Sequence, residues 1–283
     1  MHYYKDVSII LVSYKSSNKV LDYLKNISKK IQIIVVDNSN NIKLKNDICR
    51  KYRNVKVILS NNIGYGAAAN LGKKFIKSKY FILSNPDIKG LNIKIIKKIY
   101  NKAIKIENNF LSVGPQINFK KKNQINTLEK VKKISGSFMF FNSKTFDELK
   151  GFDENIFLYF EEDDICKRGN KKGFNTYIIN DIKLDHKAGT TPENLSINKK
   201  NKLQKLLLWH FIWSKFYYFS KHYGKILSIL FFLPVLMRII MRIIYHEVFY
   251  DNEKKEKYKI RLSGLISSIL GKKSYKRINS NNL

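Results

Sequence analysis

The stretch Val7-Ser8-Ile9-Ile10-Leu11-Val12 decides the fold. A continuous run of apolar and β-branched residues predicts a strand that is buried on both faces. A helix is expected over residues 17–29. A second buried strand, Ile31 to Val36, ends in the polar turn Asp37-Asn38-Ser39-Asn40. One strand, one helix and a second strand of this kind make a βαβ unit, so the chain opens as an α/β protein.

The same alternation continues along the chain. We expect a helix over residues 43–52 and a strand from Val55 to Leu59. The small, glycine-rich stretch from Asn62 to Gly72 then leads into a helix, and a strand from Tyr80 to Leu83 ends in Ser84-Asn85-Pro86-Asp87. This spacing predicts a mostly parallel sheet.

Polar residues follow three of the predicted strands. They are Ser13, Asp37 and the stretch Asn85 to Asp87. Ligands of parallel α/β sheets bind beyond the carboxyl ends of the strands. The sequence therefore predicts one crevice that these residues line.

The second half continues with shorter elements and a lysine-rich segment. Residues 118–133 are expected to form a loop, and Asp185 to Thr191 another. The expected helices are 91–107, Ser143 to Leu149 and Glu162 to Lys171. The expected strands are Leu111 to Gln116, Ser135 to Phe141, which follows a tight turn, and Thr176 to Ile179. We place the end of this domain at residue 200.

Residues 201–283 have a different character and are interpreted as a basic, apolar, helical C-terminal region. The run Ile226 to Met237 is uncharged and contains Pro234, and Arg238 and Arg242 follow it. By itself this run is too short to cross a bilayer, which takes about 20 apolar residues. Two interpretations stay open, a helix lying in a membrane interface and a buried helical hairpin that packs on the main domain. The tail from Glu253 is basic, with one short apolar patch.

Composition limits the function. The 283 residues carry a formal charge of +32, which favours an anionic partner such as a phosphate or a membrane surface. Nucleic-acid binding is not favoured, because the lysines are spread along the chain and no nucleic-acid motif is present. Cys49 and Cys166 have no metal-ligand spacing and are expected to be free thiols. No signal peptide is expected, since the apolar run at Val7 is short and lacks a preceding basic region.

Four consecutive acids, Glu161-Glu162-Asp163-Asp164, close the stretch that begins at Gly151. Adjacent carboxylates repel one another, and a metal, a basic partner or proton transfer can make use of that repulsion. The simpler alternative is a solvated helix N-terminus, where acids complement the helix dipole.

These motifs together resemble those of the family 2 inverting glycosyltransferases of the GT-A fold, in particular their rhamnosyltransferase-like branch. The pieces that match, in the family's order, are Ile10-Leu11-Val12-Ser13-Tyr14, Val35-Val36-Asp37-Asn38-Ser39, Asn62 to Gly72, Ser84-Asn85-Pro86-Asp87, Gly136-Ser137-Phe138-Met139, Gly151-Phe152-Asp153-Glu154, Phe157 to Asp164, and His186 with Gly189-Thr190. The resemblance covers residues 7–224. It implies an α/β GT-A domain with a mostly parallel central sheet, followed here by the C-terminal helical appendage.

The resemblance also implies a donor site and a metal site. The implied donor-binding residues are Ser13, Tyr14, Asp37, Asn38, Asn62, Gly64, Asn70, Asn85 and Pro86. Asp37 could instead be a turn or helix-capping residue. Asp87 and His186 are the implied ligands of Mg²⁺ or Mn²⁺, and Asp185 is a spare candidate.

The acceptor hydroxyl needs a base, and the resemblance assigns it to Glu162, with Glu161 as the alternative. Asp164 and Arg168 are expected to pair one turn apart. Phe157 and Tyr159 are expected to be core residues rather than a sugar platform. The residues implied on the acceptor side are Gly136, Ser137, Asp153 and Glu154.

The function implied by the resemblance is transfer of rhamnose from dTDP-rhamnose, in the synthesis of a bacterial surface polysaccharide such as an O-antigen. The acceptor would be a polyprenyl-diphosphate-linked or free saccharide. The protein would be cytoplasmic and peripheral to the inner face of the cell membrane. The alternatives are a UDP-hexose or UDP-galactofuranose transferase, an inactive sugar-binding homologue and a basic nucleic-acid-binding protein.

Overall fold

The computed structural model describes residues 3–27, 29–106, 109–118, 127–186 and 196–277. By its internal contacts the chain divides into two compact units, which are described separately below. The first comprises residues 1–153 and 161–193, and the second comprises residues 154–160 and 194–283. The short segment 154–160 therefore packs with the C-terminal helices, which the expected boundary at residue 200 did not anticipate.

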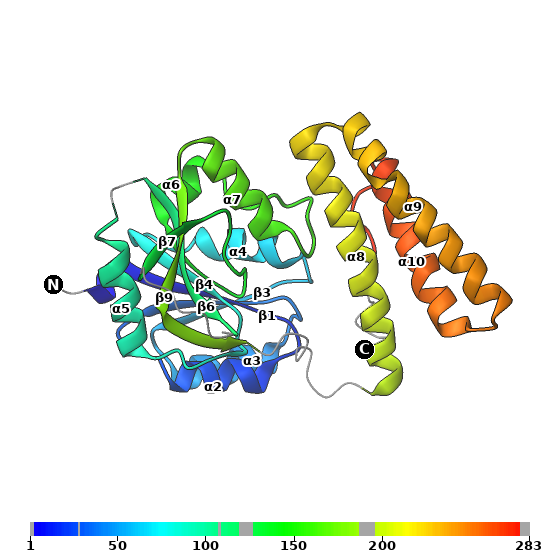
Figure 1. The fold of residues 1–283 in the computed structure, drawn as a ribbon. Helices are drawn as coiled ribbons and strands as arrows, with labels where there is room; N and C mark the ends of the chain where they lie inside the picture. The colour runs from blue at the N-terminus through cyan, green and yellow to red at the C-terminus, as the bar shows by residue number, and fades with distance from the viewer. Residues whose placement is uncertain (1–2, 28, 107–108, 119–126, 187–195, 278–283) are drawn as a thin grey trace. The chain divides into compact units, whose positions relative to one another are not determined.

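The first unit alternates strands and helices along most of its length (Figure 1). Its strands are β1 (Val7–Ser13), β2 (Gln32–Asp37), β3 (Val55–Leu59), β4 (Tyr80–Ser84), β5 (Ile88–Lys89), β6 (Phe110–Ile117), β7 (Leu128–Val131), β8 (Phe138–Asn142) and β9 (Asn175–His186). Its helices are α1 (Tyr3–Asp6), α2 (Ser17–Lys25), α3 (Ile42–Lys51), α4 (Tyr65–Lys73), α5 (Ile93–Ala103), α6 (Ser143–Glu148) and α7 (Glu161–Lys171).

One mixed sheet organises the unit, with the strand order β3-β2-β1-β4-β8-β6-β9-β5 and β7 paired to β9. The first four strands pair in parallel, and β8 joins β4 in the antiparallel direction. The register aligns Ser13 at the end of β1 with Asp37 at the end of β2. The strand ends that were predicted to meet therefore lie on the same edge of the sheet.

Alternate side chains of the central strands serve two separate cores. Ile9 and Leu11 of β1 belong to the core under α2, α3 and α5, whereas Ile10 and Val12 belong to the core under α4, α6 and α7. This two-sided burial follows from the period of two in a strand, and it explains why β1 is apolar without alternation. Figure 1 shows helices on both faces of the sheet.

Three differences from the expected elements concern short or polar strands. β5 has two residues and was not predicted. β7 lies inside the expected loop 118–133, and its exposed residues Glu129 and Lys130 gave no apolar signal. β9 continues to His186, past the expected end at Ile179, because it pairs in turn with β6, β7 and β5.

The second unit consists of three long helices and the segment 154–160. The helices are α8 (Ile197–Tyr223), α9 (Lys225–Val248) and α10 (Asn252–Ile269). Their shared core contains Ile212, Phe216, Phe232, Ile239 and Leu265. α10 lies in the region 201–283 that was expected to be helical, although its bounds were not predicted, and its buried positions include the small residues Gly264 and Ser268.

Helix α9 corrects the expected length of the apolar segment. It runs for 24 residues, through Pro234 and past both arginines, so its length and composition are sufficient for a membrane crossing. Only 17% of its most apolar window is buried. Within the second unit, α9 packs on α8 and α10 with one narrow face. Both interpretations of this segment, the interfacial helix and the buried hairpin, remain predictions.

Candidate functional site

Asp37 lies at the end of β2 and is fully buried. Its Oδ1 accepts hydrogen bonds from the hydroxyls of Ser13 and Ser39, and its Oδ2 accepts from the backbone N–H of Asn41. These bonds hold the turn after β2 together. The geometry supports the turn alternative for Asp37, and Ser13 is engaged in the same turn.

The next implied donor residues surround Gly64, the residue that caps α4. The Asn38 amide donates to the Gly64 carbonyl at 3.1 Å, and the backbone N–H of Asn62 donates to the Asn38 carbonyl. Burial raises the pKa of the Tyr14 hydroxyl, and a hydrogen bond with the Asn62 side chain opposes that rise. Tyr14, Asn38, Asn62 and Gly64 thus form one connected group at the sheet edge.

Asn70 has a structural task that the sequence did not reveal. Its amide nitrogen donates to the Phe152 carbonyl, and its amide oxygen accepts from the Phe152 N–H, both at 2.9 Å. Because both ends of the amide serve the backbone, Asn70 joins α4 to the turn at Gly151. The donor contact of Asn70 remains a prediction, and these bonds add a structural role to it.

The two implied metal ligands lie side by side. His186 Nε2 is 3.1 Å from Asp87 Oδ1, and it is 3.4 Å from the Asn85 amide nitrogen. The pairing of β5 with β9, in which Ile88 is opposite His186, brings them together. Asp87 is 8% exposed, so its carboxylate lies at the edge of the protein interior.

Asn118 fixes the backbone of His186 on both sides. Its side chain donates to the His186 carbonyl at 2.6 Å and accepts from the His186 N–H at 2.8 Å. Asn118 has a φ of 52°, in the left-handed region that asparagine tolerates. Residue 118 was expected to lie in a loop, and no pattern in the sequence indicates this contact.

Asp185 does not join Asp87, because neighbouring residues of a strand point to opposite faces. It is exposed and lies opposite Lys89. Among the residues that the structure describes, no group of three or more His, Cys, Asp or Glu side chains is arranged to hold a metal ion. A metal at Asp87 and His186 would need further ligands from a substrate or from water.

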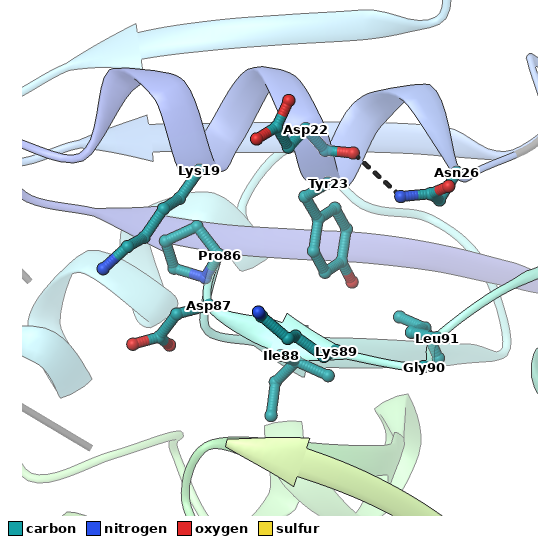
Figure 2. A pocket seen from close by; sticks show the side chains of 10 residues that line it. All are labelled: Lys19, Asp22, Tyr23, Asn26, Pro86, Asp87, Ile88, Lys89, Gly90 and Leu91. Atoms are coloured by element: carbon teal, nitrogen blue, oxygen red, sulfur yellow. Dashed lines mark hydrogen bonds between the residues drawn. The ribbon is translucent and has the colours of Figure 1, made fainter. Parts of the chain in front are cut away.

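A cavity of about 380 Å³ opens beside Asp87 (Figure 2). It lies between α2 and the stretch Pro86 to Leu91, and Lys19 and Lys89 contribute the positive charge of its wall. Its volume is at the lower end of the range of ligand sites. Neither lysine was singled out in the sequence, where lysine is too frequent to mark a position.

The candidate base, Glu162, faces the backbone of Gly136. A Cβ placed on Gly136 would lie 3.2 Å from the Glu162 Cδ, so a larger residue at this position would require the carboxyl to shift. Burial raises the pKa of Glu162 above its ordinary 4.5, and the charge of Asp163 adds to the rise. The Gly136 N–H, which hydrogen-bonds the carboxylate, and the charge of Lys133 oppose it.

Tyr65 connects the acids with the glycine turn. Its hydroxyl donates to the Gly136 carbonyl at 2.9 Å. Burial raises the pKa of this phenol well above its ordinary value, and the charges of Glu161, Glu162 and Asp87 raise it further. The charges of the candidate base and of the candidate metal ligand therefore both affect the Tyr65 hydroxyl. Tyr65 lies within the glycine-rich motif Asn62 to Gly72, but it was not among the predicted site residues.

The predicted pair in α7 is confirmed as structural. Arg168 Nε donates to Asp164 at 2.7 Å, and its two terminal nitrogens donate to the carbonyls of Leu149 and Gly151. Asp164 is fully buried. The pair fixes α7 to the turn at Gly151, which leaves Glu161 and Glu162 as the candidates for chemistry.

The remaining implied residues are divided between the two units. Ser137 is buried, and its carbonyl accepts from the Asn85 N–H. Pro86 lines the cavity. Asp153 ends the first stretch of unit one, whereas Glu154 is an exposed residue of unit two.

Two curated proteins are similar in sequence to this chain. No protein-family model matches the chain. The chain is 24% identical over 198 residues to the low-salt glycan biosynthesis hexosyltransferase Agl10 of Haloferax volcanii, a match that covers 60% of this chain and 63% of that protein. It is 25% identical over 212 residues to the rhamnosyltransferase WbbL of Escherichia coli K12, which covers 61% and 80%. The chain thus spans less than two thirds of the length of Agl10.

Solved structures share the fold at low identity. TarS 1–349 of S. aureus in complex with UDP aligns over 97% of this chain and 95% of its own, with a TM-score of 0.51 and 14% identity. GalNAc-T7 with UDP, GalNAc and Mn²⁺ aligns over 76% of this chain and 50% of its own, with a TM-score of 0.54 and 12% identity. This chain has the GT-A glycosyltransferase fold. The GT-A fold and the resemblance to glycosyltransferases expected from the motifs are thereby confirmed.

Proposed function

We propose that this GT-A protein is an inverting, metal-dependent glycosyltransferase that moves a hexose or deoxyhexose from a nucleotide-sugar donor to a lipid-linked or free saccharide. One observation carries most of the proposal. The Asp87–His186 pair and the partly buried carboxyl of Glu162 both lie in the first unit, and the charges of Asp87 and Glu162 both raise the pKa of Tyr65. This combination suits a transferase, in which one group holds the donor phosphates and another takes the acceptor proton.

Asp87 and His186 fit a divalent cation. An oxygen and a nitrogen ligand 3.1 Å apart, with few other protein ligands near, suit Mn²⁺ or Mg²⁺ that also takes oxygen atoms from a diphosphate. When bound, the metal would offset the negative charge of the departing nucleoside diphosphate. Mn²⁺ and UDP in GalNAc-T7 are consistent with such a site.

Glu162 is the proposed base. As the acceptor hydroxyl oxygen bonds to the anomeric carbon, its proton passes to the Glu162 carboxylate, and the bond from that carbon to the diphosphate oxygen breaks on the opposite face. The raised pKa of Glu162 favours proton uptake at that moment. Attack from the face opposite to the leaving group inverts the configuration of the sugar.

The best single donor is dTDP-rhamnose, because WbbL is a rhamnosyltransferase. A UDP-sugar such as a UDP-hexose or UDP-galactofuranose is the alternative, since TarS and GalNAc-T7 both bind UDP. We propose that the acceptor is a saccharide on a polyprenyl diphosphate, used in a surface polysaccharide such as an O-antigen.

The surface of α9 supports attachment to the cytoplasmic face of an anionic membrane. Large apolar side chains are exposed along the helix, and they include Ile226, Leu227, Leu230, Phe231, Leu233, Met237, Met241, Ile244 and Val248. Lys225, Arg238 and Arg242 are exposed among them and suit lipid phosphates. Because α9 packs along the lysine-rich α10, burial across a bilayer would also draw those charges into lipid, so we propose that α9 lies in the interface.

Vesicle sedimentation tests this attachment. The full chain should sediment with phosphatidylglycerol vesicles, and the double variant Leu230→Ser with Phe231→Ser should stay in solution. Ile42→Ser is a matched control, since Ile42 is 63% exposed on α3, far along the chain. Equal sedimentation of the double variant and the wild type would exclude α9 as the membrane contact.

Calorimetry with dTDP-rhamnose, UDP-glucose, UDP-N-acetylglucosamine, UDP-galactose and UDP-galactofuranose, each with Mn²⁺ and with chelator, tests the transferase itself. Binding of one donor that depends on Mn²⁺ would support the proposal and identify the sugar. If none of the donors binds, the inactive sugar-binding homologue becomes the better description.

A further inference from the structure

A short turn before β8 holds the carboxylate of the candidate base. We call residues 135–138 the Gly136 turn, and a hydrogen bond of 3.3 Å from the Phe138 N–H to the Ser135 carbonyl closes it. The Gly136 N–H donates to the Glu162 carboxylate. The turn and Glu162 both belong to the first unit, so this contact lies within one compact part of the chain.

Two hydrogen bonds from other elements fix the carbonyl groups of the Gly136 turn. The Asn85 N–H donates to the Ser137 carbonyl at 2.9 Å, which ties the turn to the end of β4. The Tyr65 hydroxyl donates to the Gly136 carbonyl, also at 2.9 Å. Gly136 thus accepts from Tyr65 and donates to Glu162, so one residue connects the phenol with the carboxylate.

Gly136 needs such an external contact. The carboxyl of Glu162 approaches so closely that a Cβ on Gly136 would lie 3.2 Å from its Cδ, which favours glycine at this position. Glycine, however, has the widest range of backbone conformations, and contacts with its neighbours must select one of them. The bond from Tyr65 supplies this constraint at the carbonyl of the same residue.

Tyr65 can hold the turn because its own position is well defined. It is the first residue of α4, and its ring packs against the core under α4, α6 and α7. The carbonyl of the preceding Gly64 accepts from the Asn38 amide at 3.1 Å. A Cβ on the following Gly66 would lie 3.4 Å from the Glu161 Cγ, so the first turn of α4 lies against the start of α7.

We propose that Tyr65 is a positioning residue for the Glu162 carboxylate, and that it acts by fixing the Gly136 turn through the bond from its hydroxyl to the Gly136 carbonyl. The inference rests on the proposed function, since it assumes that Glu162 takes the acceptor proton. The phenol directs its single proton at a backbone carbonyl, so it is not itself the acid or the base. A displacement of a reacting group by about 1 Å can reduce a rate about 100-fold.

Tyr65→Phe is the main test, because it removes the hydroxyl and keeps the ring in the core. With the donor found by calorimetry, we expect the kcat for nucleoside diphosphate release to fall about 10-fold and the donor KM to stay within about twofold. Tyr100→Phe is the matched control. The Tyr100 hydroxyl donates to Asp6 at 2.7 Å in the same unit, and its ring lies in the core on the other face of the sheet.

The control variant should keep the kcat of the wild type, because it loses a comparable hydrogen bond away from the Gly136 turn. An equal loss of kcat in Tyr65→Phe and Tyr100→Phe would reduce the effect to general destabilisation and overturn the proposal.

A double variant tests whether Tyr65 acts through Glu162. In the Glu162→Gln background the carboxylate to be positioned is absent, so adding Tyr65→Phe should lower the remaining kcat by no more than about twofold. The full loss of about 10-fold in both backgrounds would assign Tyr65 a role independent of Glu162 and would contradict the positioning mechanism.

Titration of Glu162 separates this proposal from the transferase function, since it needs no substrate. The titratable side chains that interact with this carboxyl include Asp163, Lys133, Tyr65 and Cys166. Tyr65→Phe changes no charge among them, because the raised pKa of Tyr65 keeps the phenol neutral near pH 7. The variant therefore reports on the hydrogen bond from the Gly136 N–H rather than on a lost charge.

The titration is followed by carbon NMR of the full chain with labelled glutamate carboxyl groups, and the Glu162 signal is the one absent from Glu162→Gln. We expect a higher pKa of Glu162 in Tyr65→Phe than in the wild type, because a weakened bond from Gly136 stabilises the carboxylate less. An unchanged pKa would overturn the positioning role, even in an active enzyme. A higher pKa in a protein that binds no donor would support the positioning role and contradict the transferase function instead.

Discussion

The carboxylate of Asp87 lies 3.1 Å from the imidazole of His186, at the point where β5 pairs with the far end of β9. Each side chain alone has a simpler structural explanation. Their proximity, beside a cavity that Asp87 itself lines, makes a shared role in donor binding testable.

Asp87→Ala should weaken donor binding in Mn²⁺ at least about 100-fold, to the level of the wild type with chelator, because it removes the carboxylate of the proposed metal site. His186→Ala should act in the same direction. Asp185→Ala is the matched control, since Asp185 is exposed and points to the opposite face of the strand. If calorimetry showed that Asp87→Ala keeps the wild-type affinity for the donor in Mn²⁺, Asp87 would not be a metal ligand.

Glu162→Gln should keep donor affinity and lower kcat about 10²- to 10⁴-fold, because the amide cannot take up the acceptor proton. Glu161→Gln, with the same change in shape, should cost much less. Steady-state kinetics of the two variants decide between the acids, and the reverse order of losses would move the base to Glu161.

The acid limb of the kcat–pH profile should lie above pH 4.5, because burial raises the pKa of Glu162 and the base works only when deprotonated. Activity is therefore full above the raised pKa and is lost as the pH falls through it. Lys133→Ala should move the limb to higher pH, since Lys133 favours the charged carboxylate. The neighbouring Lys132→Ala should leave it in place.

Gly136→Ala should lower kcat about 10- to 100-fold with donor affinity retained, because the new methyl group would lie 3.2 to 3.4 Å from the Glu162 carboxyl and displace it. The shorter acid in Glu162→Asp would relieve this crowding. The double variant should therefore be no slower than Glu162→Asp alone, and additive losses would contradict the steric explanation.

The second unit should lose stability in mild acid. Burial lowers the pKa of His210 from 6.5 to about 4, and the charges of Arg277 and Lys276 lower it further. The unfolded chain then binds the extra proton first, so stability is full above about pH 6.5 and falls as the pH approaches 4. The free energy of unfolding can fall by about 3 kcal/mol. Urea unfolding of His210→Gln should show a smaller difference between pH 7.5 and pH 5.

Apolar strands and the order of the motifs were predictable from sequence, whereas contacts made by amides and by short strands were not. In a strand such as β1, every residue is buried, so every residue of its apolar run helps to predict the strand. β5 gains its place only by pairing with β9, which begins 86 residues further along the chain. Asn70 and Asn118 use both ends of their amides on backbone groups distant in sequence, and a local pattern contains no record of such partners.

The acidic residues at the start of α7 also differ in how much the sequence predicts about them. The spacing of Asp164 and Arg168 predicts their pair, because helical geometry alone brings residues four apart together. The distinct surroundings of Glu161 and Glu162 depend on where Gly66 and Gly136 approach α7. Without knowledge of those neighbours, the sequence cannot assign different roles to two adjacent glutamates.

The Arg277 guanidinium lies 3.6 Å from the centroid of the Phe157 ring, and this contact within the second unit has a consequence for biosynthesis. Roughly 120 residues separate them, so at typical rates of translation the ribosome needs on the order of ten seconds to proceed from one to the other. During that interval the nascent sheet can already form, while the segment 154–160 lacks its partners in the second unit. The second unit thus completes its packing only after its last helix has emerged.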